Sequence, residues 1–270
     1  MSAGRTLLVT GATGRLGGAT VRALAVRGDR LLLTGRNTAR LDQLAAEVNS
    51  QANEGSYPPG TQVRTLTVDA TEPEGAQHAA AEAVRGFGPL DGLVHLVGSF
   101  SVGPVMLTDV SAYEDVLRAN FLSAVVATQA VLPHLGEGGR LVYFGTPLSD
   151  QPLAAMSSYA ASKAALVAWM RSAAHEVKKR GIHANAISLT LVETPEMRAE
   201  MPQVDPDLTV DAELVGHAVR FLTGPDSEGM YGSVVPVVGK FGFTSALAGG
   251  PPPGVRGTAG AGAGAGRPGR

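Results

Sequence analysis

Short apolar runs alternate along this chain with longer stretches in which apolar positions recur every three or four residues. Short apolar runs between turn residues are typical of buried strands, and the longer periodic stretches are typical of helices that pack on a sheet. Regular alternation of the two predicts βαβ units. We therefore expect an α/β fold, with a doubly wound parallel sheet of seven strands and helices on both faces.

These patterns also set the expected bounds of each element. Strands are expected at residues 6–10, 30–34, 62–68, 92–97, 140–145, 182–188 and 233–238. Helices are expected near residues 15–27, 37–49, 72–86, 109–135, 157–180 and 211–223, several of them after an Asp, Ser or Thr that favours a helix start. Residues 51–60, which contain a Tyr-Pro-Pro-Gly run, are predicted to form a surface loop.

Composition changes clearly at one place, near the C-terminus. From about Thr244 onward the chain consists mainly of Ala, Gly and Pro with scattered Arg, and it has almost nothing to bury. We therefore predict one domain over residues 1–243 and a disordered tail over residues 244–270. The alternative is a functional tail that closes over a neighbouring subunit's site.

The charge and the cysteine content of the chain limit the kinds of partner and chemistry that it can have. The chain has 22 basic and 24 acidic residues without long runs of either sign, so we expect neither nucleic acid nor a membrane surface as partner. The absence of cysteine excludes disulfides and thiol catalysis, and the six histidines show no metal-ligand spacing. The first nine residues lack a signal-peptide core, and no uninterrupted apolar run reaches the ~18 residues that span a bilayer. We expect a soluble, cytoplasmic protein that acts on a small molecule.

A glycine-rich turn follows the first predicted strand. Glycines at a strand-to-helix turn let the backbone approach a pyrophosphate, and the amides at the helix start then face the phosphates. The turn therefore predicts a dinucleotide-binding site, and the alternative is a tight turn that only packs a helix closely on the sheet. The residues assigned to the cofactor in this turn are Gly11, Thr13, Gly14, Arg15, Leu16 and Gly17.

Two arginines indicate which dinucleotide binds. The second predicted strand leads into Arg36, at a place where a protein that selects NAD is expected to offer a carboxylate to the ribose 2′-hydroxyl. Arg36 and Arg15 are instead suited to a 2′-phosphate through charge-assisted hydrogen bonds. We therefore predict NADP(H) rather than NAD(H), with solvated arginines of no specific role as the alternative.

Tyr159 and Lys163 lie four residues apart, so a helix places the phenol and the ammonium on one face. A free phenol titrates near pH ~10. A lysine ammonium a few Å away favours the phenolate and lowers the pKa of the phenol. The pair therefore predicts a proton donor for a carbonyl oxygen. For the pair alone, a surface tyrosine that packs on a lysine stem is the alternative.

With these residues in place, the chain resembles the short-chain dehydrogenase/reductase family, in its compact single-domain branch, over roughly residues 5–243. The resemblance implies a Rossmann-like fold and hydride transfer with a nicotinamide cofactor. The Gly-x-x-Gly-x-x-Gly spacing of the turn departs from that branch and resembles the family's extended branch. Besides the turn, the resemblance rests on Asp69, Asn120, Tyr159, Lys163, Asn185 and Thr194.

The resemblance also implies catalytic roles. Tyr159 is expected to donate or accept the proton, and Lys163 to hold the nicotinamide ribose and lower the pKa of the tyrosine. Asn120 is expected to support a proton relay through water, with hydrogen bonds to the helix backbone as the alternative.

Thr146 stands where the family has a serine that orients the substrate carbonyl, and threonine keeps that hydroxyl. The alternative for Thr146 is a turn residue before a proline. Ser149 and Ser157 are weaker replacements for the orienting hydroxyl.

The resemblance also assigns cofactor contacts to residues that follow other predicted strands. Asp69 is expected at the adenine amine, Gly98 at the cofactor, and Thr194 at the nicotinamide carboxamide. For Asp69 the alternative is a cap of the next helix. Where the family usually has Asn-Asn-Ala-Gly, this chain has His-Leu-Val-Gly, so we expect His95 to take over structural hydrogen bonds. Asn185 is also expected to be structural.

Together these features predict a ketoreductase that uses NADPH to reduce a ketone or aldehyde reversibly to an alcohol. The altered family segments leave two alternatives: a non-redox lyase, isomerase or dehydratase, and a catalytically silent nucleotide sensor. Residues 189–210 are expected to cover the substrate. Helices 109–135 and 157–180 carry more apolar surface than one sheet face needs, so a homotetramer or dimer is expected.

Overall fold

The computed structural model describes residues 4–240, and the tail predicted over residues 244–270 lies outside them. Its main sheet is parallel, with the strand order β3-β2-β1-β4-β5-β6-β9. The strands of this sheet are β1 (Thr6–Thr10), β2 (Arg30–Gly35), β3 (Gln62–Thr67), β4 (Leu90–His95), β5 (Leu135–Gly145), β6 (His183–Leu189) and β9 (Val234–Val237). A short parallel pair, β7 (Val192–Glu193) and β8 (Val210–Asp211), lies apart from it.

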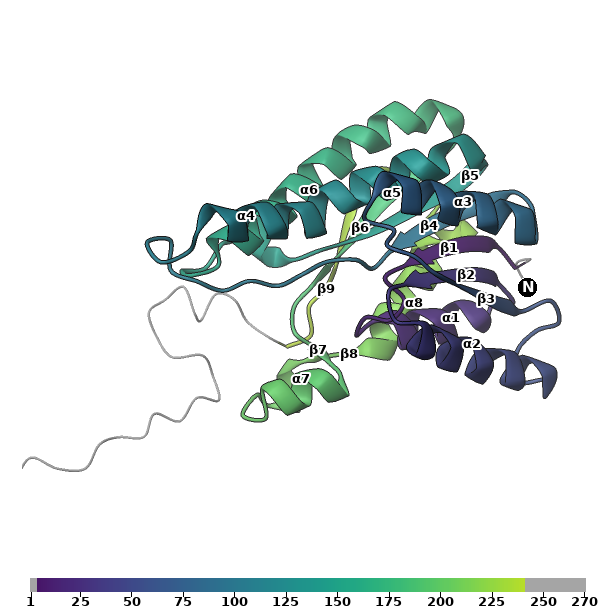
Figure 1. Ribbon diagram of the computed structural model, residues 1–270, viewed down its shortest axis with the longest axis horizontal. Coiled ribbons are helices and arrows are strands. Elements are labelled where there is room, and N and C mark those ends of the chain that lie inside the picture. The colour runs from purple at the N-terminus through teal and green to yellow at the C-terminus, as the bar shows by residue number, and fades with distance from the viewer. Residues whose placement is uncertain (1–3, 241–270) are drawn as a thin grey trace, which may run out of the picture.

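Helices cover both faces of the sheet (Figure 1). One face carries α1 (Gly17–Ala25), α2 (Thr38–Asn53) and α8 (Ala212–Leu222). The other face carries α3 (Pro73–Phe87), α4 (Val110–Leu117), α5 (Ser123–Val131) and α6 (Ser157–Val177). The short helix α7 (Pro195–Glu200) lies beside β7 and β8. This is the doubly wound α/β architecture that the alternating pattern predicts.

Burial on both faces explains why the strands read as continuous apolar runs. Successive side chains of a strand point to opposite faces. Leu7 and Val9 accordingly pack in the core under α1, α2 and α8, whereas Leu8 packs in the core under α3, α5 and α6. All residues of β1 and of β6 are buried. A sheet buried in this way needs apolar side chains at consecutive positions.

Besides shifts of one to three residues at several ends, three elements differ clearly from the expected bounds. The helix expected at residues 109–135 is interrupted by a π-helical turn at Arg118–Leu122, between α4 and α5. β5 begins five residues earlier than expected, at Leu135. α2 continues to Asn53, into the segment predicted to be a loop. In addition, α7, β7 and β8 form within the segment predicted only as a substrate cover.

The helical segment Val110–His134 bears on the expectation that no segment could span a membrane. By length and mean hydropathy this segment is able to cross a bilayer, although charged residues such as Glu114, Asp115 and Arg118 interrupt its apolar run, as expected from the sequence. The segment contains α4, the π-helical turn and α5, and α5 packs against α3 and against β4. It therefore belongs to the layer that covers the sheet, and core helices of soluble proteins pass the same test.

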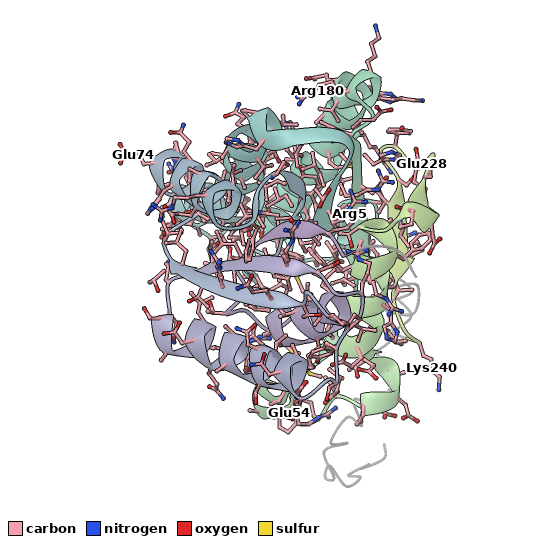
Figure 2. The ribbon with its side chains drawn as sticks, turned by 90° about the vertical axis from the view of Figure 1, so that its right-hand side faces the viewer. Arg5, Glu54, Glu74, Arg180, Glu228 and Lys240 are labelled. Atoms are coloured by element: carbon pink, nitrogen blue, oxygen red, sulfur yellow. The ribbon has the colours of Figure 1, made fainter. Side chains whose placement is uncertain are left out.

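The amino edge of the sheet is held by contacts of the buried Arg140 and the half-buried Arg5. Arg140 is 2% exposed, and its guanidinium donates to the Gly138 carbonyl and pairs with Glu228 at 2.8 Å. Arg5 donates to the same Gly138 carbonyl at 2.6 Å, and its backbone amide donates to the buried Asp29 carboxylate. Figure 2 views the molecule from the side on which Arg5 and Glu228 lie. These contacts tie together the starts of strands that are distant in sequence.

Candidate active site

The glycine turn lies at the carboxyl end of β1 and has no room for side chains at two of its glycines. Gly11 has a φ of +71°, and a Cβ there would lie 2.9 Å from the Val97 backbone nitrogen. A Cβ on Gly17 would lie 1.7 Å from the Ala12 carbonyl oxygen. The turn therefore needs glycine both to approach the end of β4 and to start α1 directly against the strand. A bare backbone at a helix start fits the pyrophosphate of a dinucleotide.

The other assigned residues of the turn extend this surface. Gly14 donates its amide to the Gly11 carbonyl at 2.9 Å, and Leu16 occupies the position just before α1. Thr13 lies against the end of β2, where a Cβ on Gly35 would approach the Thr13 hydroxyl to 2.9 Å. The turn thus brings β1 and β2 together at one edge, as the dinucleotide prediction requires.

Arg15 and Arg36 flank the same edge, with Asp69 nearby. Arg15 forms an ion pair with Glu200 of α7. Asp69 accepts hydrogen bonds from the amide and the hydroxyl of Thr71, at 3.0 and 2.7 Å. These bonds lower the pKa of the Asp69 carboxyl, and the charge of Arg36 acts in the same direction. The structure therefore gives Asp69 a turn-forming role before α3, and its contact with adenine stays a prediction.

α6 brings Tyr159 and Lys163 to the carboxyl ends of β4 and β5. Lys163 is 6% exposed, and its ammonium donates to the Phe144 carbonyl at 2.8 Å. Burial lowers the pKa of Lys163 to about 8. A Cβ on Gly98 would lie 2.7 Å from Oδ1 of Asn120, so a glycine after β4 makes room for the Asn120 amide. Thr146 is buried directly after β5, its hydroxyl accepts from the Leu148 amide at 3.4 Å, and its side chain lowers the pKa of Tyr159.

The pKa of Tyr159 moves opposite to the sequence-based expectation. Burial raises the pKa of the Tyr159 phenol to about 12, and the Thr146 side chain only partly offsets this rise. Lys163 does not acidify the phenol in this arrangement, because its ammonium is directed at the Phe144 carbonyl. The prediction of a lowered pKa is therefore wrong for the structure described, and the phenol stays protonated at neutral pH.

Asn120 lies in the π-helical turn and is fully buried. Its amide oxygen accepts from the Ser99 amide, and its amide nitrogen donates to the Ser99 carbonyl and to the Ser162 hydroxyl, each at 2.9 Å. Insertions of this kind in helices are frequent at functional sites. Asn120 thus fastens the segment after β4 to α6, and its role in a proton relay stays a prediction.

Ser162 is a site residue that the sequence did not single out. Its hydroxyl accepts from Asn120 and donates to the Tyr159 carbonyl at 2.8 Å, so it links the two predicted catalytic residues. A serine three residues after the tyrosine was the available signal, because positions three apart share a helix face. Its partner Asn120 is 42 residues away in sequence, and that contact could not be foreseen.

Comparison with known proteins places the chain in a family. The profile of the short chain dehydrogenase family matches residues 5–205, about three quarters of the chain. The chain belongs to this family. Dehydrogenase/reductase SDR family member 7B of Bos taurus is 31% identical over 193 residues, which covers 70% of this chain. The chain spans 58% of the length of that relative and 62% of its Danio rerio counterpart.

Other relatives match this short-chain dehydrogenase over most of their length. L-xylulose reductase of Bos taurus is 29% identical over 252 residues, which covers 88% of this chain and 97% of the relative. A short chain dehydrogenase from Burkholderia cenocepacia, solved in complex with NADP, is 28% identical with a TM-score of 0.77 and covers 88% of this chain and 97% of that one. These matches confirm the Rossmann-like fold and the oxidoreductase family.

His95 has the structural role that the sequence suggested for this short-chain dehydrogenase. Its ring is 2% exposed, and it bonds to the Thr10 hydroxyl at 2.8 Å and to the Ser123 hydroxyl at 3.0 Å. Ser123 donates its own proton to the Ala119 carbonyl, so Nε2 of His95 carries the hydrogen. Burial lowers the pKa of His95 to about 3 and keeps the ring neutral. This network joins β1, β4 and the π-helical turn.

Asn185 and Thr194 also make hydrogen bonds within the protein. The amide group of Asn185 donates to the Met230 carbonyl and accepts from the Ser233 amide, each at 2.9 Å, which confirms a structural role. Thr194 is 5% exposed and accepts from the Met197 amide at 3.1 Å, so it caps α7. Contact of Thr194 with the nicotinamide stays a prediction.

An apolar segment borders the phenol. The Phe100 ring meets the Tyr159 ring edge-on, with 4.9 Å between the centroids. The segment after Phe100 is fastened to the start of α6, because the Gly103 amide donates to the Ala155 carbonyl at 2.8 Å. Ala155 has a φ of +62°, a strained conformation for a residue with a Cβ. Exposed apolar side chains follow in this segment, namely Val102, Val105, Met106 and Leu107.

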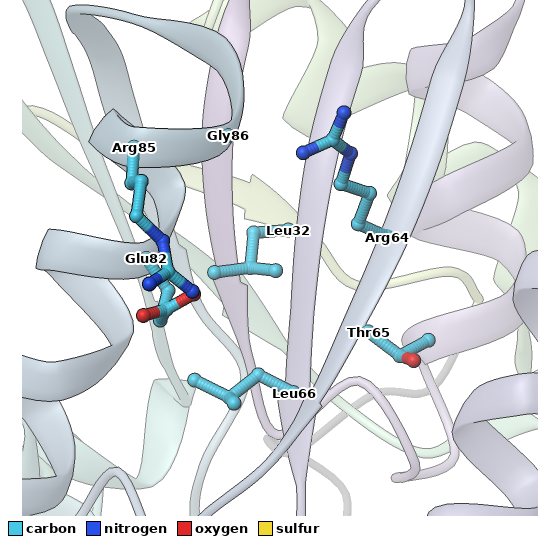
Figure 3. Close-up of a pocket in the computed structure, with 7 residues that line it drawn as sticks. All are labelled: Leu32, Arg64, Thr65, Leu66, Glu82, Arg85 and Gly86. Atoms are coloured by element: carbon cyan, nitrogen blue, oxygen red, sulfur yellow. The ribbon is translucent and has the colours of Figure 1, made fainter.

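Two surface hollows differ in their relation to this site. One hollow of about 280 Å³ lies between β3 and α3, where Arg64, Glu82 and Arg85 line it (Figure 3). None of the predicted site residues lines that hollow. A second hollow of about 270 Å³ includes Gly14 and Arg15 of the glycine turn, and it therefore adjoins the cofactor side of the site.

Proposed function

We propose that this protein is a cytoplasmic, NADP(H)-dependent ketoreductase that interconverts a carbonyl and an alcohol by hydride transfer. The observation that carries the proposal is the Tyr159 phenol, whose pKa the Thr146 side chain influences, with Lys163 buried one helical turn away. The phenol is protonated at neutral pH, as a proton donor has to be, although its raised pKa makes it a weaker acid than a free phenol.

The roles divide among the chain's own residues. Tyr159 gives its proton to the carbonyl oxygen, and the Thr146 hydroxyl orients that oxygen. Lys163, whose buried ammonium lies at the carboxyl end of β5, holds the nicotinamide ribose. Asn120 holds Ser99 and Ser162 in place and supports return of the proton. When bound, the nicotinamide cofactor supplies the hydride.

Arg15 and Arg36 support NADP(H) as the cofactor. No carboxylate follows β2 at the place where NAD selection would need one. A relative that is 28% identical was solved in complex with NADP. The glycine turn and Gly98 complete the cofactor site, together with Asp69 at the adenine and Thr194 at the carboxamide.

The substrate is a small carbonyl compound with an apolar group beside the reacting carbon. Phe100 lies against Tyr159 and offers an aromatic face, and the exposed apolar residues that follow it extend that surface. Burial of such a group contributes binding energy roughly in proportion to its apolar area. A homotetramer or dimer is the proposed assembly.

The proposal is tested by following absorbance at 340 nm with a panel of ketones and aldehydes, with NADPH and NADH compared at equal concentrations. We expect turnover with apolar ketones and at least tenfold higher kcat/KM with NADPH. A clear preference for NADH would contradict the cofactor assignment. Product formation without net cofactor oxidation would instead identify the non-redox alternative.

A further inference from the structure

Two ion pairs fasten α7 to the nucleotide side of the molecule. Glu200 at the end of α7 pairs with Arg15 of the glycine turn, and Glu196 pairs with Arg40 at 2.8 Å. Arg40 lies in the first turn of α2, four residues after Arg36. The paired residues are 185 and 156 positions apart in sequence, so both pairs are tertiary contacts.

Both arginines face one hollow. The hollow of about 270 Å³ between α7 and the helices α1 and α2 has charged lining residues of both signs, namely Arg15, Arg22, Arg40, Glu47, Glu193 and Glu196. Arg22 is engaged by Glu213 of α8 at 2.8 Å. Arg15 and Arg40 are therefore the arginines of this hollow whose carboxylate partners belong to α7.

Arg15 has two competing partners once the proposed cofactor is considered. It is assigned with Arg36 to the 2′-phosphate, yet in the structure its guanidinium holds the Glu200 carboxylate. Arg36 forms no ion pair with any residue between positions 4 and 240. A phosphate monoester carries close to two negative charges near pH 7. Such a group is repelled by the two α7 carboxylates and attracted by the arginines that they occupy.

The exposure of these pairs makes an exchange of partners feasible. The Arg15 and Glu200 side chains are 48% and 55% exposed, and those of Arg40 and Glu196 are 49% and 37% exposed. Ion pairs this exposed are weak and are screened by salt. A dianion held by charge-assisted hydrogen bonds is the stronger ligand for a guanidinium.

We propose that Glu196 and Glu200 determine cofactor specificity by competing with the 2′-phosphate for Arg40 and Arg15. The inference rests on the proposed use of NADP(H). The apparent affinity for a 2′-phosphate is then reduced by the fraction of molecules in which the carboxylates hold the arginines. By linkage, a bound 2′-phosphate releases α7 to the same extent. A cofactor that lacks this phosphate leaves both ion pairs in place.

Binding of 2′,5′-ADP and of 5′-AMP by titration calorimetry tests this, because the two probes differ only in the 2′-phosphate. The variants are Glu196→Gln, Glu200→Gln and the double variant. Glu82→Gln is the matched control, since Glu82 pairs with Arg85 on α3, away from the site. We expect the double variant to bind 2′,5′-ADP about three- to tenfold more tightly at low salt, with 5′-AMP affinity unchanged and with no effect in the control.

A second measurement does not depend on the variants. Hydrogen exchange of residues 195–204 in the wild-type protein is expected to rise when 2′,5′-ADP is added and to stay unchanged with 5′-AMP. The proposed competition would be overturned if the double variant gained equal affinity for 2′,5′-ADP and 5′-AMP. It would also be overturned if 2′,5′-ADP left the hydrogen exchange of residues 195–204 in the wild-type protein unchanged. If wild-type protein does not favour 2′,5′-ADP over 5′-AMP at all, the NADP(H) assignment itself fails, and this outcome is distinct from the first two.

Discussion

Burial lowers the pKa of two bases near the carboxyl edge of the sheet, His95 and Lys163, with different consequences. It lowers the pKa of His95 to about 3 and the pKa of Lys163 to about 8. At neutral pH the imidazole is therefore neutral and serves as a hydrogen-bonding bridge, whereas the ammonium keeps its charge. His95 therefore has a structural role, whereas Lys163 remains a cation at neutral pH.

Replacing Tyr159 by Phe removes the proposed proton donor and keeps the ring that Phe100 contacts. We expect carbonyl reduction to fall by about 10²–10⁴-fold, the usual contribution of a positioned general acid. NADPH affinity, measured by fluorescence titration, is expected to change little. Retained reductase activity in this variant would refute the assigned role.

The pKa of Lys163 predicts the alkaline limb of the reduction. Below pH 8 the ammonium is charged, and above pH 8 it loses its proton, while the Tyr159 phenol, with a pKa of about 12, is still protonated. We expect kcat/KM for reduction to fall about tenfold per pH unit above pH 8. A profile measured from pH 6 to 10, with circular dichroism as the control for unfolding, checks this. A flat profile up to pH 10 contradicts it.

The depressed pKa of His95 links stability to acid. In the unfolded chain His95 binds a proton below pH ~6.5, but in the folded protein its pKa is about 3. Its contribution to the free energy of unfolding is thus complete above pH ~6.5 and falls by about 1.4 kcal/mol per pH unit below it. Urea unfolding of wild type and His95→Asn at pH 7, 6 and 5 tests this. We expect the difference in free energy of unfolding between wild type and variant to shrink as the pH is lowered from 7 to 5. A difference that stays constant over this range would contradict the prediction.

At the scale of elements, the junction of β1 and α1 is the tightest contact in the cofactor site. Gly17→Ala places a Cβ 1.7 Å from the Ala12 carbonyl oxygen, so the helix has to move. We expect a loss of about 1–3 kcal/mol in the free energy of unfolding and weaker nucleotide binding. Gly136→Ala is the matched control, because a Cβ there meets nothing within 4 Å. Similar losses in both variants, measured by urea unfolding, would show that the close approach is unimportant.

The regular elements could be predicted from sequence because burial on both faces gives β1 and β6 uninterrupted apolar runs. The π-helical turn could not, since its extra residue depends on tertiary contacts such as that of Asn120 with Ser99. α7 was missed because it has only six residues, half of them charged, and because its position depends on distant arginines. The raised pKa of Tyr159 was missed because spacing places Lys163 on the same face but does not say where its ammonium points.

At the scale of the whole molecule, exposed apolar side chains cluster around α4. Met106, Leu107 and Val110 are 91%, 81% and 72% exposed. A monomer rarely leaves large side chains of this kind exposed in one contiguous patch. Together with the family's frequent pairing of helices, this supports assembly into a dimer or tetramer. Light scattering at micromolar concentration is expected to give a multiple of 27.6 kDa, and a mass of 27.6 kDa would contradict the assembly.

The arginine contacts at the amino edge bear on how the protein can be engineered. The five residues of β1 separate that edge from the glycine turn by roughly 16 Å, and substitutions this far apart usually have additive effects on stability. A library of variants restricted to the carboxyl-edge loops therefore leaves the contacts of Arg5 and Arg140 intact. New substrate pockets can thus be built at the carboxyl edge while the arginine contacts that join the strand starts stay in place.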